Sequence, residues 1–295
     1  MESNQLISIG LPISLIIIMI GIGMTLTLND FRQVVHKPKG LILGSVSQIV
    51  GMPVIAFGLA WLFSLPAEIA VGLVIIAACP GGTASNLFVL LLRGNVALSI
   101  VLTVTASLIT ILTLPIAASY ALDVFSSASI QIELPVKTMI SMMIGVVLVP
   151  VVLGMVLRYF WPNWAARAEN WVNKLGGLTL LLLVVSILYD IGEDFIHLLI
   201  QAGGAAISLN IIGIAAGILI AKFNQLSIKD GLTIGVELGV KNSTLALMVS
   251  VTLLDSSTMS IPIIVYSVSM FACAFILTLY GRRTYSEDTV SAETA

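Results

Sequence analysis

The sequence predicts an all-α integral membrane protein with nine transmembrane helices. Hydrophobic residues make up 58% of the chain, and the mean hydropathy is +1.11. Only 9% of the residues are charged, against about 25% in an ordinary soluble domain. This composition excludes a soluble globular domain. The net charge of −2 also provides no surface for a nucleic acid.

Apolar stretches of a length that crosses a bilayer, about 20 residues each, recur along the whole chain. They are Ile7–Leu28, Leu41–Phe63, Ile69–Leu92, Val96–Leu122, Val136–Leu157, Leu175–Leu188, Phe195–Ala221, Gly231–Leu254 and Ser260–Tyr280. The first lacks the basic leader of a signal peptide, so we expect it to be retained as a helix. Residues 1–283 are therefore expected to form one transmembrane domain, followed by a polar, disordered tail at 284–295.

The charges between the stretches predict the orientation, because Lys and Arg are retained on the cytoplasmic side. With the N-terminus outside, the inner loops hold 11 of the 13 basic residues. These are Arg32, Lys37, Lys39, Arg93, Arg158, Arg167, Lys174, Lys222, Lys229, Arg282 and Arg283. An odd number of spans then leaves the C-terminus in the cytoplasm. The predicted location is the inner (plasma) membrane, with the lipid bilayer as a partner.

Two of the nine spans are predicted to be interrupted. In the third, Pro80 is followed by Gly81 and Gly82, and a proline removes a helical N–H and clashes with the preceding turn. The eighth carries a matching disturbance around Gly239. A break within a membrane is tolerated only where protein or a water-filled cavity surrounds it. Breaks at corresponding places favour an inverted-repeat transporter fold with two crossing helices.

The eighth span also carries Glu237 and, four residues later, Lys241. A charge at the centre of a membrane helix costs roughly 2.5–3.5 kcal/mol, so such residues usually mark a functional site. Ser85 and Asn86 follow the first break, while Ser99 and Thr103 lie on one face of the fourth span. With Glu237 they form a candidate hard-cation site of hydroxyl, amide and carboxylate oxygens.

Each of these features also has a purely structural explanation. The hydroxyls of Ser99 and Thr103 can bond to their own helix, and Pro80 alone can act as a kink. Glu237 and Lys241, at i and i+4 with Glu first, can form a salt bridge. The combination of breaks, charges and oxygen ligands favours the functional interpretation.

At these residues the chain resembles the bile acid:sodium symporter family, whose bacterial members take up bile acids or other organic anions. The resemblance is carried by Cys79-Pro-Gly-Gly-Thr-Ala-Ser-Asn86, by Glu237-Leu-Gly-Val-Lys-Asn242 and by Gln48-Ile-Val-Gly-Met-Pro53. It implies a ten-helix inverted-repeat fold, of which this chain lacks the first helix. The first, fifth and sixth helices would form a panel domain, and helices two to four and seven to nine a core domain.

The resemblance also implies the site residues. The first sodium site would consist of Ser85, Asn86, Ser99, Thr103 and Glu237. The second would consist of Gln48, Glu237, the backbone at Leu238 and Val240, and the side chain at position 241. Thr83 and Asn242 would face the substrate.

Lys241 departs from the family, which usually has a glutamine there. A charged lysine has three donors and no acceptor, so it cannot ligate sodium. We expect its ammonium to replace the second ion, paired with Glu237 and Gln48, leaving one sodium or none. With one sodium and a monoanion, transport would be electroneutral. Alternatively, Lys241 releases and takes up a proton during the cycle.

The expected function is import of an organic anion, bile-acid-like or a small carboxylate, by cation-coupled secondary transport. A proton-coupled or sodium-independent anion transporter and a cation/proton antiporter are the alternatives. An intramembrane enzyme is disfavoured, because the sequence has no His-Glu-x-x-His motif and no second carboxylate within a span. A ligand sensor that does not transport is a further alternative. No cofactor other than Na⁺ is expected, and the oligomeric state is open, with a monomer as one option.

Overall fold

The computed structural model describes residues 2–25, 38–125, 136–168 and 195–293, with single positions at 171, 174, 175, 178, 181 and 185. Within these ranges the chain is helical and contains no strand. Five of the described helices are long and apolar enough to cross a membrane: Pro38–Leu62, Val96–Phe125, Val136–Phe160, Ile196–Phe223 and Ser260–Leu279. The protein is therefore a multi-pass helical membrane protein.

The first half of the chain, up to residue 125, contains α1 (Glu2–Thr25), α3 (Pro38–Val46), the π-helical segment η1 (Ser47–Gly51), α4 (Met52–Leu62), α5 (Ala67–Ala78), α6 (Thr83–Leu91) and α7 (Val96–Phe125). The second half contains α8 (Val136–Met143), η2 (Ile144–Leu148), α9 (Val149–Phe160), α11 (Phe195–Phe223), α12 (Ile228–Gly239), α13 (Ser243–Leu247), η4 (Met248–Leu253) and α14 (Ser260–Glu293).

Two of the π-helical segments have a cause in the sequence. Pro53 and Pro150 each stand two residues after such a segment, and a proline cannot donate to the helical ladder. At η1 the N–H of Met52 bonds to the carbonyl of Ser47, five residues back. Such π segments often occur at functional sites, and η1 contains Gln48.

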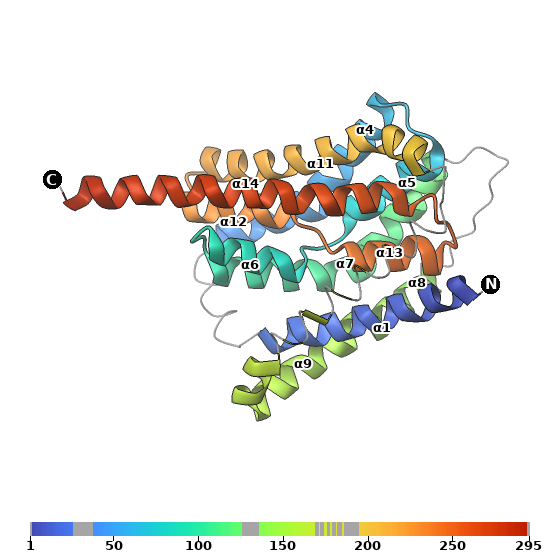
Figure 1. Cartoon of the computed structure of the whole chain (residues 1–295), viewed down its shortest axis with the longest axis horizontal. Helices are drawn as coiled ribbons and strands as arrows, with labels where there is room; N and C mark the ends of the chain where they lie inside the picture. The colour runs from blue at the N-terminus through green and yellow to red at the C-terminus, as the bar shows by residue number, and fades with distance from the viewer. Residues whose placement is uncertain are drawn as a thin grey trace.

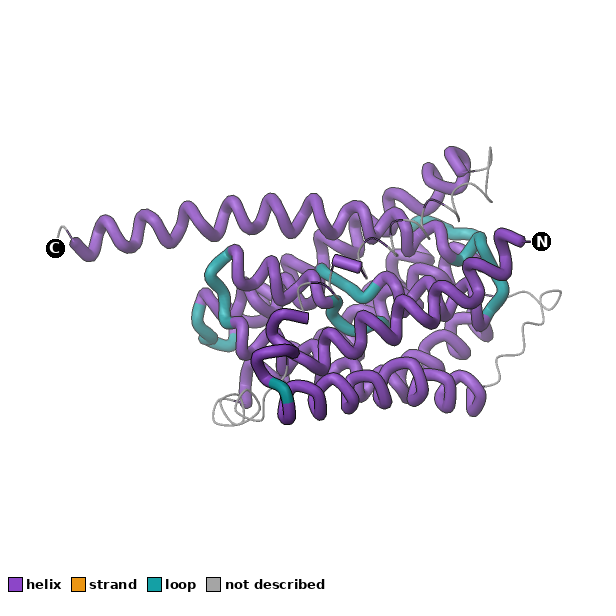
Figure 2. The backbone as a smooth tube through the Cα atoms, turned by 60° about the horizontal axis from the view of Figure 1, so that its bottom comes forward, coloured by secondary structure: helices purple, strands orange, loops and turns teal. Residues whose placement is uncertain are grey.

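The helices form two groups. In Figure 1, α1 and α9 run side by side below the remaining helices, and they approach closely where Gly23 faces Gly154, as small residues allow in membrane helices. Above them, α11 packs against α12 and α14, and α5 packs against α7. The two ends of the chain lie at opposite ends of the long axis (Figures 1 and 2).

The five long helices match the second, fourth, fifth, seventh and ninth predicted spans. The sixth predicted span, 175–188, falls outside the described residues except at four single positions. The count of nine spans and the inverted repeat therefore stay predictions. The disordered tail predicted from residue 284 is wrong, because α14 runs on to Glu293. No glycine or proline follows Gly281, so nothing in the polar segment stops the helix.

Candidate functional site

The two interrupted segments meet. α5 ends at Ala78 and α6 begins at Thr83, while α12 ends at Gly239 and α13 begins at Ser243. The short connections between them pair as an isolated antiparallel β-bridge between Gly81 and Lys241.

Backbone hydrogen bonds hold this crossing together. The N–H of Gly82 donates to the carbonyl of Val240 at 3.2 Å, and the N–H of Asn242 donates to the carbonyl of Pro80 at 2.9 Å. All four residues are buried. Each connection therefore satisfies peptide groups that the other break leaves without a helical partner, which is the condition for irregular backbone inside a bilayer.

A buried carboxylate lies beside the crossing. Glu237 is fully buried near the end of α12. Its Oε1 lies 2.5 Å from the hydroxyls of both Ser85 and Ser99, and its Oε2 accepts from the hydroxyl of Thr103 at 2.9 Å. An added Cβ on Gly81 would overlap with Oε2. The α5–α6 connection, α6 and α7 therefore converge on one carboxylate of α12.

The contacts between oxygen atoms around this carboxylate outnumber the hydroxyl hydrogens that could form hydrogen bonds in them. Ser85 Oγ lies 2.7 Å from the carbonyl of Gly82 as well as 2.5 Å from Glu237. Ser99 Oγ lies 2.7 Å from Asn86 Oδ1 as well as 2.5 Å from Glu237. Each hydroxyl has one hydrogen to donate, so two hydroxyls face four acceptor contacts. A small cation with a preference for oxygen ligands fits such a set.

Lys241 does not make the predicted salt bridge. Its ammonium donates to the carbonyl of Cys79 at 3.1 Å, and no ion pair with Glu237 occurs among the described contacts. The i, i+4 argument assumes a continuous helix, whereas α12 ends at Gly239 between the two residues. Lys241 is 1% exposed. The ammonium therefore lies at the C-terminal end of α5, where a helix dipole favours positive charge.

The residues expected to form a second cation site are only partly brought together. Gln48 is 1% exposed, and neither atom of its amide has a hydrogen-bond partner among the described residues. The backbone carbonyls at the end of α12 are already occupied. Tyr266 donates toward the carbonyls of Leu238 (3.3 Å) and Gly239 (2.9 Å), and Asn210 Nδ2 donates to Gly239 at 2.6 Å.

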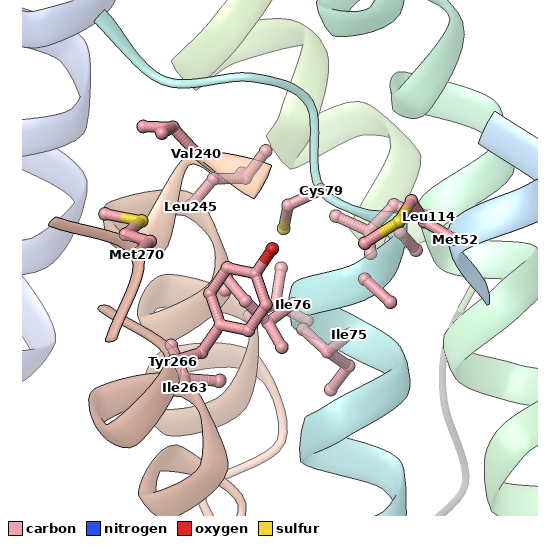
Figure 3. Close-up of a cluster of buried hydrophobic side chains, with 14 of the residues drawn as sticks. Met52, Ile75, Ile76, Cys79, Leu114, Val240, Leu245, Ile263, Tyr266 and Met270 are labelled. Carbon is pink, nitrogen blue, oxygen red and sulfur yellow. The ribbon is translucent and has the colours of Figure 1, made fainter. Parts of the chain in front are cut away.

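Sequence reasoning missed Tyr266 and Asn210. Both are fully buried polar side chains within apolar spans, which was the signal available in the sequence. Figure 3 shows the Tyr266 hydroxyl reaching from α14 toward Cys79, among apolar side chains that include Ile76 and Met52.

Thr83 and Asn242, the residues expected to face the substrate, lie at the starts of α6 and α13. Asn242 Oδ1 accepts from the N–H of Leu245 at 3.0 Å and so caps α13. Its Nδ2 is buried without a hydrogen-bond partner among the described residues. Thr83 is half-buried. The side-chain amide of Asn242 thus places a donor beside the crossing that no described residue engages.

Comparison with known proteins identifies relatives along most of the chain. The Sodium Bile acid symporter family model matches residues 12–198, a segment that contains the candidate ligands on α6 and α7 but not Glu237. A Bacillus subtilis protein named as an uncharacterized sodium-dependent transporter, YocS, is 33% identical over 81% of this chain and 73% of its own length.

Two further relatives come from eukaryotes. The probable sodium/metabolite cotransporter BASS1 of Arabidopsis thaliana chloroplasts is 29% identical, over 92% of this chain and 66% of its own length. Human sodium/bile acid cotransporter 4 is 30% identical, over 62% of this chain and 40% of its own length. The chain thus spans about two thirds of the plant relative and less than half of the human one.

Proposed function

Because the chain belongs to the Sodium Bile acid symporter family, we propose that it is a sodium-coupled secondary transporter that moves an organic anion by alternating access. The relatives named as sodium-dependent transporters and cotransporters support the sodium coupling. The protein would act in the plasma membrane, with the C-terminus in the cytoplasm.

The observation that carries the proposal is the excess of oxygen acceptors around Glu237. A sodium ion bound by Ser85, Ser99, Thr103, Asn86 and Glu237 would accept lone pairs from oxygens that two hydroxyl hydrogens cannot satisfy. Its charge would also offset a buried carboxylate that has no basic partner within ion-pair distance among the described residues. An uncompensated buried carboxylate is costly.

Lys241 would act as a tethered cation in place of a second sodium. Its fixed ammonium lies against the carbonyl of Cys79, while donors from Tyr266 and the crossing occupy the carbonyls of Leu238 and Val240. Carbonyls at the ends of broken helices are the usual ligands for a coupling ion. Because the ammonium of Lys241 has no acceptor to offer an ion, we infer one mobile sodium per cycle. Transport of a monoanion would then be electroneutral.

The two helix groups support a division into a panel and a core, the parts that alternating access requires. The pair α1 and α9, with the predicted sixth span, would form the panel, and the helices that carry the crossing would form the core. α6 and α13 both start at the crossing, where the Nδ2 of Asn242 has no hydrogen-bond partner among the described residues. Helix N-termini favour anions, so a carboxylate group of the substrate is expected there.

Aromatic side chains support the proposed position in the membrane. Phe57, Trp61 and Phe125 form one cluster at the ends of α4 and α7. Tyr159, Phe160 and Trp161 form another at the end of α9. Aromatic residues gather at both interfaces of a bilayer.

The test is stabilisation of the purified full chain by sodium, with two serines of α7 as matched variants. Ser99 lies against Glu237, whereas Ser107, equally buried, bonds to the carbonyl of Thr103 in its own helix. We expect NaCl, but not KCl, to raise the unfolding temperature of the native chain and of Ser107→Ala. Ser99→Ala should lose most of this gain. Equal protection by KCl, or full protection of Ser99→Ala, would contradict the proposal.

A further inference from the structure

A polar contact joins α7 and α12 at the end of the molecule from which both helices start. Asn95 Nδ2 donates to Asp230 Oδ1 at 2.7 Å, and the N–H of Asn95 donates to Thr233 Oγ1 at 2.8 Å. Asn95 also caps α7 by accepting from the N–H of Leu98 at 3.1 Å. Asp230 accepts from Ser227, the residue that caps α12, at 2.7 Å. The starts of two helices are thus fastened to each other.

The turn that carries Asn95 is fitted closely against α12. Gly94 lies so near Thr233 that an added Cβ would come within 2.7 Å of its hydroxyl oxygen. Arg93, the residue before it, has a φ of 61°, which is uncommon for a residue with a side chain. Arg93 therefore adopts a sparsely populated backbone conformation immediately before the residues that contact α12.

This contact and the candidate cation ligands lie along the same interface between α7 and α12. Ser99 and Thr103 of α7 continue the four-residue spacing that starts at Asn95, the residue that caps this helix. Thr233 and Glu237 have the same spacing on α12, so each set lies along one side of its helix. Asn95 meets the start of α12, while Ser99 and Thr103 meet Glu237 one turn and more further along. The relative height and separation of the two helices at Asn95 therefore determine the distances at the carboxylate.

We propose that Asn95 and Asp230 are positioning residues for the cation site, an inference that rests on the proposed sodium site around Glu237. Neither residue touches that site. By fixing α7 against α12, their hydrogen bond holds the hydroxyl of Ser99 at 2.5 Å from Glu237. Ligands held within about 0.5 Å of the binding geometry lose little freedom when the ion arrives.

A charge exchange tests this role while keeping both helix caps. Asn95→Asp retains an oxygen for the N–H of Leu98, and Asp at a helix N-cap is as favourable as Asn. It replaces the hydrogen bond to Asp230 by two opposed carboxylates. Adding Asp230→Asn restores the hydrogen bond in the opposite direction, with an amide donor at position 230 and a carboxylate acceptor at position 95.

The readout is the sodium concentration that gives half of the maximal thermal stabilisation of the purified chain, with choline chloride holding the ionic strength constant. We expect Asn95→Asp to raise this concentration about tenfold, the effect of losing one charge-assisted hydrogen bond. The double variant should return to within about twofold of the native value. Asp230→Asn alone, which keeps a neutral pair, should shift it about threefold.

Lys39→Met is the control for loss of an unrelated contact at the same end. Lys39 bonds to the carbonyl of Asn224, between α11 and α12, so its loss should leave the half-saturating sodium concentration unchanged. If Asn95→Asp binds sodium as the native chain does, or the double variant does not recover, the positioning role is overturned while the sodium site stands. If sodium fails to stabilise the native chain, the proposed function is overturned as well.

Discussion

Replacement of Lys241 by glutamine should raise the number of bound sodium ions from the proposed one to two. The variant removes the ammonium and offers an amide oxygen in a buried position. It also removes the 3.1 Å hydrogen bond to the carbonyl of Cys79. Leaving a buried carbonyl without its donor costs about 1–3 kcal/mol, so Lys241→Gln should be less stable than the native chain in sodium-free buffer.

Sodium should reverse that loss of stability. The stability gained per tenfold rise in sodium concentration should report how many ions bind. Each site that binds sodium only in the folded state adds about 1.4 kcal/mol for every tenfold rise in concentration above its dissociation constant. The native chain should gain about 1.4 kcal/mol per decade, and Lys241→Gln about 2.8 kcal/mol. At a sodium concentration about 100-fold above the dissociation constants, the free energy of unfolding of the variant should have caught up with that of the native chain.

The measurement is the free energy of unfolding in mixed detergent micelles as a function of sodium concentration, at constant total salt. Lys241→Met is the control, because it removes the same charge but has no oxygen to offer an ion. Its slope should stay at one ion. Equal slopes for the native chain and Lys241→Gln over the whole range would refute the tethered-cation argument.

Two further predictions concern the packing around the carboxylate and the end of α12. Gly81→Ala should abolish stabilisation by sodium without unfolding the protein, because its Cβ would overlap with Oε2 of Glu237. Gly58→Ala is the control, because a Cβ there meets nothing within 4 Å, and it should keep the native response. Thermal unfolding in NaCl measures both variants. Tyr266→Phe should lower the free energy of unfolding by about 1 kcal/mol, the worth of one hydrogen bond, because the carbonyls of Leu238 and Gly239 lose a shared donor. An unchanged stability would show that this hydroxyl bond contributes nothing.

The convergence of Ser99 and Thr103 on Glu237 could be predicted because it follows partly from local rules. Four-residue spacing places Ser99 and Thr103 on one helical face, and Pro80 with its glycines marks where a helix must stop. In the structure both hydroxyls reach Glu237. The two interrupted spans suggested the grouping of these residues across three spans, and the family resemblance implied the same set.

The remaining contacts depend on how distant helices pack, and the local sequence does not encode that. Asn210 and Tyr266 reach the end of α12 from α11 and α14. The contact between Asn95 and Asp230 spans 135 residues of sequence. The salt bridge expected for Lys241 failed for a related reason, because i, i+4 geometry ends where the helix does.

The paired connections at the crossing also bear on how the chain is made. The segment around Pro80 is synthesised roughly 160 residues before its partner around Asn242, a delay of about 10–30 s at ordinary translation rates. During that interval the N–H of Gly82 and the carbonyl of Pro80 lack the partners that they have across the crossing. The α5–α6 pair is therefore expected to wait near the translocon or in a hydrated state until α12 arrives. The second half of the sequence thus acts as a late insertion partner for the first, and a truncation before α12 should leave the earlier helices prone to degradation in the cell.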